Sequence, residues 1–279
     1  MKGKLSIVPT PIGNLEDITF RALRVLREAD AVLCEDTRHS TPLLNHYAIK
    51  KTLISYHEHN EQSRSEEILK RLKEGENFAL ISDAGFPGVS DPGAVLIRKA
   101  LKENLPVEVL PGASASITAL VFSGFSGGSF YFHGFLSRKH KEREEEKERI
   151  KKCICPVILY ESPKRLKSTL EELEELMPGR KAAVIRELTK IYEERIFGAL
   201  PEVLEKLPEN VKGEIVLILG PYEEEKNFDL EGALKNKLKQ GISMSRAVKE
   251  VTKESGLPKN EVYAYGLKLK GEEDDGIFF

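Results

Sequence analysis

The first apolar run of the chain, Leu5-Ser6-Ile7-Val8, passes directly into Pro9-Thr10-Pro11-Ile12-Gly13-Asn14. A short apolar run bounded by turn residues is typical of a buried strand. In an open α/β sheet, ligands bind beyond the carboxyl ends of the strands, where such loops gather. The two segments therefore predict a first strand followed by one wall of a small-ligand cleft.

The same alternation of a short apolar run and an amphipathic segment continues to Ser123. The predicted strands are Leu5–Val8, Ala31–Cys34, Thr52–Tyr56, Phe78–Ser82 and Val107–Leu110. The predicted helices are Thr19–Ala29, Arg38–Tyr47, Ser63–Glu74, Gly93–Glu103 and Ala113–Ser123. Strict alternation of strand and helix predicts a mostly parallel sheet with helices on both faces, which makes residues 1–123 a first α/β lobe.

A second α/β lobe is predicted over residues 124–222, beginning in the glycine-rich segment Ser123–Ser129. Its predicted strands are Phe130–His133, Val157–Tyr160, Lys181–Ile185, Glu193–Gly198 and Glu214–Leu219. One close pair of strands has a short connection, so this sheet is expected to be mixed. The segment Arg138–Lys152 holds eight Lys/Arg and five Glu, which predicts an exposed helix or, alternatively, an arm that contacts phosphate.

The C-terminal part is predicted to be a linker at 223–229, a small helical module at 230–270 and an acidic tail at 271–279. Within the module, Ser245–Tyr263 has helix–turn–helix character, with one helix stopping at Gly256 and the next beginning near Asn260. Residues 230–270 carry nine Lys/Arg and four Asp/Glu. This surplus of positive charge has two interpretations: the module binds an anionic partner such as RNA, or it has an ordinary solvated helical surface. Both stay open, because helix–turn–helix shapes also occur in proteins that do not bind nucleic acid.

Composition places the chain among ordinary water-exposed globular proteins, with 40% hydrophobic and 32% charged residues. The sequence contains no run of 18 apolar residues, so no membrane span is predicted. The first apolar run is too short for the core of a signal peptide. Three cysteines, two of them spaced C-x-C, favour a reducing compartment over a disulfide framework. We therefore expect a cytoplasmic protein with no metal site.

Three loops that follow predicted strands are rich in glycine and proline: Pro9–Asn14, Ser82–Gly93 and Pro111–Ser116. Ordinary strand-to-helix turns are the simpler interpretation, but the twelve residues of the second loop exceed what such a turn needs. Neither G-x-G-x-x-G after the first strand nor G-x-x-x-x-G-K-[ST] is present. The predicted cleft therefore lacks the usual signatures of dinucleotide and nucleoside-triphosphate sites.

Nine strings in these loops and strand ends occur together and in order. They are Pro9–Thr19, Cys34–Arg38, Ser82–Gly85, Ser90–Gly93, Pro111–Ala115, Gly134–Leu136, Tyr160–Pro163, Arg186–Lys190 and Gly213–Leu217. As a set they resemble the tetrapyrrole-methylase superfamily, and within it the methyltransferases of small-subunit ribosomal RNA. Ser137 and Lys164 depart from that pattern, where proline and histidine are usual, and both lie in segments expected to face substrate.

The resemblance implies two α/β lobes with S-adenosylmethionine bound in the cleft between them, commonly in a homodimer. It also implies 2′-O-methylation of a cytidine ribose in 16S rRNA, within the small ribosomal subunit and near the decoding site. Two rivals stay open: a methyltransferase of the same superfamily that acts on a tetrapyrrole or a protein, and a non-catalytic RNA-binding factor of ribosome assembly.

Site residues follow from this resemblance. The residues expected to bind the cofactor, mainly through neutral backbone groups, are Pro11, Asp83, Ala84, Gly85, Ser114, Ala115 and Tyr160. Asp83 is the side chain expected to accept a hydrogen bond from the cofactor, with helix capping as the alternative.

A general base is expected at Glu35 or Asp36, although loop capping and an ion pair with Arg38 explain these carboxylates equally well. Asn14 is expected to face the methyl acceptor. The cationic residues expected near RNA phosphate are Arg38, Lys164, Arg165, Arg186 and Lys190, with Glu187 holding Arg186.

Overall fold

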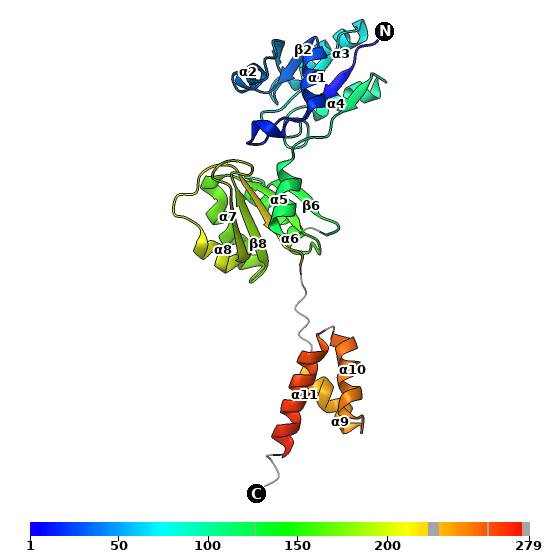
Figure 1. Cartoon of the computed structure of the whole chain (residues 1–279), viewed down its shortest axis with the longest axis vertical. Helices are drawn as coiled ribbons and strands as arrows, with labels where there is room; N and C mark the ends of the chain where they lie inside the picture. Colours follow the sequence, from blue (N-terminus) through cyan, green and yellow to red (C-terminus); the bar gives the residue numbers. More distant parts are fainter. Residues whose placement is uncertain (126, 223–228, 256, 275–279) are drawn as a thin grey trace. The chain divides into compact units, whose positions relative to one another are not determined.

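The chain forms two separate compact units in this computed structural model, Met1–Tyr222 and Glu223–Phe279. The structure describes residues 1–125, 127–222, 229–255 and 257–274, and side chains as far as residue 269. Figure 1 shows the two lobes of the first unit and the helices of the second. The predicted linker falls almost wholly outside the described residues, as do Gly256 and the last five residues of the predicted tail.

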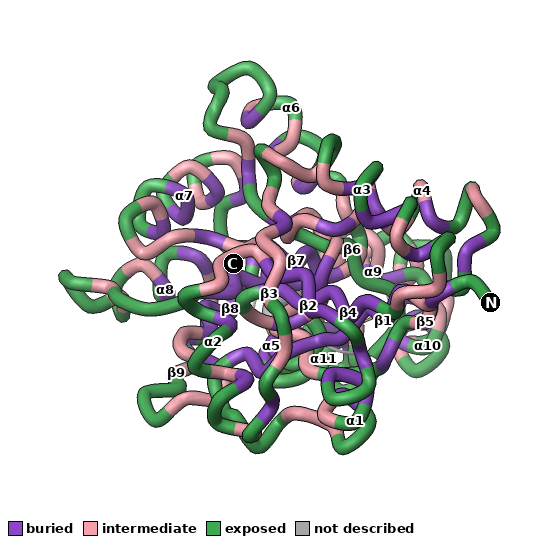
Figure 2. The backbone as a smooth tube through the Cα atoms, turned by 90° about the horizontal axis from the view of Figure 1, so that it is seen from above, coloured by how far each residue is buried: buried purple, intermediate pink, exposed green. Residues whose placement is uncertain are grey.

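The first sheet is parallel throughout, with strand order β3-β2-β4-β1-β5. Its strands are β1 (Leu5–Ile7), β2 (Ala31–Cys34), β3 (Thr52–Ser55), β4 (Phe78–Leu80) and β5 (Val107–Val109). Figure 2 shows the buried backbone along β1, β2 and β4 at its centre. The predicted parallel sheet is confirmed.

Helices cover both faces of this sheet, as predicted. They are α1 (Phe20–Glu28), α2 (Thr37–His46), α3 (Glu61–Glu74) and α4 (Ala94–Lys102). Along β1 and β2, alternate side chains point to opposite faces. Leu5, Ile7 and Leu33 join the core beneath α3 and α4, whereas Val8, Val32 and Cys34 join the core beneath α1 and α2.

The second sheet has the order β6-β7-β10-β8-β9 and is mixed, as predicted. Its strands are β6 (Tyr131–Phe135), β7 (Val157–Glu161), β8 (Lys181–Arg186), β9 (Glu194–Ala199) and β10 (Ile215–Leu219). Only β6 and β7 pair in parallel; the other three pairs are antiparallel. One face packs against α7 (Pro163–Leu176) and α8 (Leu200–Lys206).

The opposite face of the second sheet is covered by α5 (Ala115–Ser123), as Figure 1 also shows. Ala119 and Leu120 of α5 are buried against Ile158, Ile185 and Ile218. The predicted lobe boundary at Ser123 therefore places in the first lobe a helix whose packing partners lie in the second. The physical junction between the lobes is the loop between β5 and α5.

The charge run forms α6 (His140–Lys151), but one side of this helix is buried. Arg143 Nε donates to Glu172 Oε2 at 2.8 Å, and Arg143 Nη2 donates to Thr169 Oγ1 at 2.8 Å. Thr169 Oγ1 in turn donates to Glu161 Oε2 at 2.7 Å. The predicted helix is confirmed, yet its buried arginine anchors it to α7 and to the end of β7.

Replacing Thr169 by valine tests this buried chain of hydrogen bonds. Valine keeps the volume but leaves Arg143 Nη2 and Glu161 Oε2 without this partner, which costs about 1–3 kcal/mol in the free energy of unfolding. Urea denaturation of the full chain, followed by circular dichroism, measures the loss. Ser168→Ala is the matched control, because Ser168 is exposed and its hydroxyl donates to a backbone oxygen, Arg165 O, at 2.9 Å. Equal losses in both variants would contradict the network.

The second unit holds α9 (Leu230–Lys239), α10 (Met244–Ser255) and α11 (Lys259–Asp274), so both helices of the predicted helix–turn–helix are present. They enclose a small core of Leu234, Val248, Val251 and Val262. The first four residues of the predicted acidic tail continue α11. Across the described ranges of the chain, no helix is long and apolar enough to span a bilayer.

Candidate functional site

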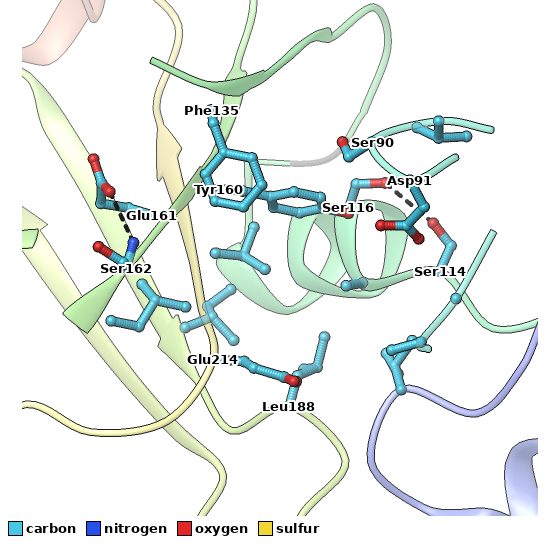
Figure 3. Close-up of a pocket in the computed structure, with 18 of the residues that line it drawn as sticks. Ser90, Asp91, Ser114, Ser116, Phe135, Tyr160, Glu161, Ser162, Leu188 and Glu214 are labelled. Atoms are coloured by element: carbon cyan, nitrogen blue, oxygen red, sulfur yellow. Dashed lines mark hydrogen bonds between the residues drawn. The ribbon is translucent and has the colours of Figure 1, made fainter. Parts of the chain in front are cut away.

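A cavity of about 410 Å³ opens between the loops of the two lobes. This volume is within the range of small-ligand sites. Its walls come from the β4–α4 loop, the start of α5, the ends of β6, β7 and β8, and the start of β10. The lining side chains that carry the argument below are Asp91, Ser116, Phe135, Tyr160, Glu161 and Glu214 (Figure 3).

The loops after β1 and β4 are joined by a short antiparallel bridge. Thr10 N donates to Gly85 O and Gly85 N donates to Thr10 O, each at 3.0 Å. Gly85 has φ +76°, a conformation that glycine adopts without strain. Thr10 Oγ1 adds a bond to Ser82 O at 3.1 Å. These contacts hold Ala84 and Gly85 at the edge of the cavity.

The opposite walls are shaped by α5 and β7. Ser114 caps α5, and its Oγ lies 3.1 Å from Ser116 Oγ. The ring of Tyr160 meets Phe132 and Phe135 edge to face, at centroid distances of 5.3 and 5.5 Å. Burial raises the pKa of the Tyr160 hydroxyl, so it stays neutral and is available as a hydrogen-bond donor. This side of the cavity combines an aromatic surface with small hydroxyls.

Negative charge predominates in the cavity. Among the described residues that line it there is no Lys or Arg, whereas Asp91, Glu161 and Glu214 are carboxylates. Burial, above all, raises the pKa of Asp91, and the nearby Asp83 adds to the effect, while a hydrogen bond with Ser82 opposes it. Polyphosphate ligands are disfavoured in such a site. A ligand with an apolar ring, hydroxyls and a positive charge fits it.

A second cavity, of about 420 Å³, lies in the first lobe. Its walls include Pro11, Gly13, Leu15 and His39, together with Asp83. His39 Nδ1 lies 3.0 Å from Asp83 Oδ2, and this contact raises the pKa of His39. The two cavities adjoin the same segments, because Ile12, Ala84 and Gly85 line the first cavity while their chain neighbours line the second.

Comparison with known proteins assigns the family. The family model "Tetrapyrrole (Corrin/Porphyrin) Methylases" matches residues 4–204, and the model "RsmI C-terminal HTH domain" matches residues 229–270. "Ribosomal RNA small subunit methyltransferase I" of Halalkalibacterium halodurans is 42% identical over 271 residues, covering 94% of each chain. The Bacillus subtilis protein of the same name is 42% identical over 277 residues, covering 95% of each.

This chain belongs to the ribosomal RNA small subunit methyltransferase I family of tetrapyrrole methylases. A solved diphthine synthase shares the fold, with a TM-score of 0.63 at 15% identity over 78% of this chain and 90% of that one. The expected family, the two α/β lobes and the helix–turn–helix module are thereby confirmed. Membership of this family supports S-adenosylmethionine as the methyl donor. The first cavity suits its sulfonium and its adenosine, because the described residues that line it include no Lys or Arg.

The structure brings most of the predicted cofactor-binding residues of this methylase together. Ala84, Gly85, Ser114, Ala115 and Tyr160 all line the first cavity. Pro11 and Asp83 line the second cavity instead. Their assignment to the cofactor stays a prediction, and for Asp83 the observed partner is His39.

The two candidate bases of the methylase line neither cavity, and their environments differ. Burial raises the pKa of Glu35, and the carboxylates of Asp83 and Asp91 raise it further. Asp36 caps α2 and accepts hydrogen bonds from the side chain and backbone of Arg38, which lower its pKa to about 2. The capping and ion-pair interpretation therefore describes Asp36 well, whereas Glu35 has the pKa direction that suits a base.

The predicted RNA-facing cations have varied surroundings. Lys164 is exposed at the start of α7, and Arg38 is exposed beside Asp36. Arg165 is half-buried and donates to Leu136 O at 3.1 Å. Arg186 pairs with Glu194 at 2.8 Å.

The Glu187 side chain is not the hydrogen-bond partner of Arg186 that we expected. Glu187 Oε1 instead accepts from Lys190 Nζ at 3.0 Å and from Glu214 N at 2.9 Å. Lys190 also pairs with Glu214 at 3.1 Å, so the loop between β8 and β9 is tied to the start of β10. Asn14 caps a short 3-10 helix, η1 (Leu15–Asp17), by accepting from Glu16 N.

Sequence reasoning did not select several residues that line the first cavity. Asp91, Glu161 and Ser162 lay inside the strings Ser90–Gly93 and Tyr160–Pro163, but only Tyr160 was selected from these two strings. Phe135 lay inside the string Gly134–Leu136, but it has no polar group that would have marked it as a site residue. No group of three His, Cys, Asp or Glu residues suited to a metal was found in the part of the chain that the structure describes.

Calorimetry distinguishes the predicted role of Asp83, a hydrogen bond to the cofactor, from its observed role as the partner of His39. A direct hydrogen bond to the cofactor predicts that Asp83→Ala weakens S-adenosylmethionine binding by about tenfold, because a charged acceptor is lost. It also predicts that His39→Ala, which removes the observed partner, leaves that affinity unchanged. Isothermal titration calorimetry measures both. An unchanged affinity in Asp83→Ala would show that this carboxylate does not hold the cofactor.

Proposed function

We propose that the protein transfers a methyl group from S-adenosylmethionine to a cytidine ribose 2′-hydroxyl of 16S rRNA, near the decoding site of the small subunit. The observation that carries this proposal is the extent of the likeness to two small-subunit rRNA methyltransferases, which covers 94% and 95% of the chain. The basic helical module also matches a family model, over residues 229–270. A methylase of free tetrapyrroles has little use for such a module. We further propose that the protein acts in the cytoplasm, where its substrate is found.

The first cavity is the cofactor site in this proposal. S-adenosylmethionine supplies a methyl group activated by a sulfonium. The backbone around Gly85 and Ser114 and the ring of Tyr160 fix the ligand. Its positive charge meets no Lys or Arg among the lining residues that the structure describes. The second cavity, lined in part by Gly13 and Leu15, is where we place the acceptor nucleoside.

Orientation supplies much of the acceleration in this scheme. Methyl transfer is an in-line displacement, so a fixed approach of the hydroxyl oxygen contributes up to about 7–11 kcal/mol. The Thr10–Gly85 bridge stabilises the shared wall against which both reactants are held. Close packing of Gly13 against the β8–β9 loop adds to this, since a Cβ at Gly13 would come within 2.6 Å of Lys190 Cγ.

We assign the base to Glu35 rather than Asp36. A ribose hydroxyl is a weak acid, and a carboxylate with a raised pKa accepts its proton more readily than one with a pKa of about 2. Arg38 holds Asp36 in its ionised, capping role. Arg38 and Lys164, both exposed, are the side chains that we place on RNA phosphate.

Exchange of Glu35 for glutamine is expected to lower kcat by about 10²–10⁴-fold, the usual contribution of a base. Asp36→Asn, which keeps the cap, is the matched control and is expected to change kcat far less. In the native protein Glu35 must be ionised to act as a base. We therefore expect kcat to rise as the pH increases through the raised pKa of Glu35, and activity to be lost at pH values below that pKa. Single-turnover rates across acidic and neutral pH measure this, and an unaltered profile in Glu35→Gln would refute the assignment.

A homodimer is also proposed. Its support is an exposed apolar surface on α5, where Val121 is 64% exposed and Ile117 and Phe122 are 45% and 40% exposed. Water-exposed apolar side chains grouped on one helix favour burial against a partner.

Transfer of tritium from labelled S-adenosylmethionine tests the acceptor. Purified small subunits, a porphyrin acceptor and protein acceptors are compared under the same conditions, and the label is expected in 16S rRNA alone. Mapping the modified nucleotide then tests the 2′-hydroxyl and the decoding site. Label in a porphyrin or a protein would favour the rival methyltransferases, and binding of subunits without transfer would favour a non-catalytic assembly factor.

A further inference from the structure

Three carboxylates face the first cavity, and two of them are already engaged. Glu161 is almost fully buried, and its Oε1 pairs with the cationic Arg165 Nε at 3.5 Å. Its Oε2 also accepts from Thr169 Oγ1 at 2.7 Å and its Oε1 from Ser162 N at 2.8 Å. The Glu214 side chain is 69% exposed and pairs with Lys190 at 3.1 Å. Neither carboxylate therefore offers an unscreened negative charge to a ligand.

Asp91 is different. Its side chain is half-buried and forms a hydrogen bond with the hydroxyl of Ser82, which is neutral. The charged groups that act on it are carboxylates, since Asp83 raises its pKa and Asp91 in turn raises that of Glu35. No ion pair of Asp91 occurs among the side chains that the structure describes. This carboxylate is therefore held in a cavity whose described lining residues include no compensating Lys or Arg.

The position of Asp91 directs its charge into the cavity. Figure 3 shows its carboxylate beside Ser114 and Ser116 at the start of α5, across from the ring of Tyr160. Aromatic rings attract cations through their faces, so the same region of the cavity offers a second attraction for positive charge. A permanently charged ligand would offset the cost of keeping Asp91 ionised there.

We propose that Asp91 is a specificity-determining residue that recognises the sulfonium charge of S-adenosylmethionine. This inference rests on the proposed function in taking that molecule as the methyl donor. Methyl transfer breaks the sulfur–carbon bond, forms the oxygen–carbon bond and returns the electron pair to sulfur, while the hydroxyl proton passes to the base. Sulfur is then a neutral thioether, so the attraction of Asp91 is present for the substrate and absent for S-adenosylhomocysteine.

The test compares ligands that differ in this one charge. Dissociation constants for S-adenosylmethionine, S-adenosylhomocysteine and sinefungin, which carries an amine near the sulfonium position, are measured by calorimetry on the full chain and on Asp91→Asn. We expect Asp91→Asn to lower the ratio of the S-adenosylhomocysteine constant to the S-adenosylmethionine constant on the order of tenfold, as for one partly screened charge pair. Sinefungin is expected to follow S-adenosylmethionine.

Glu214→Gln is the matched control, since it removes a carboxylate from the same cavity whose charge Lys190 already offsets. In this variant, the ratio of the S-adenosylhomocysteine dissociation constant to the S-adenosylmethionine dissociation constant is expected to equal that of the native protein. Asp91→Ser is measured in parallel, so that a folding defect in one variant still leaves a result from the other. An equal weakening of all three ligands, or no change, would overturn the proposal. Failure of the native chain to bind S-adenosylmethionine at all would instead refute the proposed function.

Discussion

The bridge between Thr10 and Gly85 is the contact on which the arrangement of the site depends. Two reciprocal backbone hydrogen bonds of 3.0 Å join loops that are 75 residues apart in the chain. Thr10 is completely buried, and the left-handed backbone of Gly85 lets the two loops approach. The joined loops form a wall shared by the two cavities. Ile12 and Gly85 line the first cavity, and Pro11 and Asp83 line the second.

Charge divides the molecule into regions with different roles. The first cavity holds carboxylates and no lining cation within the described chain, which suits a positively charged methyl donor. Cations such as Lys164 lie outside it, on exposed positions where an anionic acceptor is expected. Behind the cavity, Arg143 supports Glu161 through Thr169, so the surface helix α6 is connected to the site wall. In the proposed function, the donor and the acceptor are thus received by surfaces of opposite sign.

Much of the fold was predictable because its signals are local. Short apolar runs separated by amphipathic segments predicted every strand of both sheets, since period and length reflect burial residue by residue. The Gly- and Pro-rich loops predicted the cavity, and five of the seven expected cofactor residues line it together. The position of α5 was harder to predict from the sequence, because its apolar residues indicate that it is buried but not against which of the two sheets it packs.

The sequence by itself determined the family, the alternation of elements and most of the segments that surround the first cavity, because each depends on residues close together in the chain. Only the tertiary structure decided which carboxylates have charged partners. It places Asp83 against His39, Asp36 against Arg38 and Glu214 against Lys190. It leaves Asp91 with a hydroxyl and other carboxylates. Electrostatic surroundings arise from residues far apart in the chain, so no local pattern reports them. The stretch from Leu5 to Asn14 thus predicted a cleft, and folding decided the charge within it.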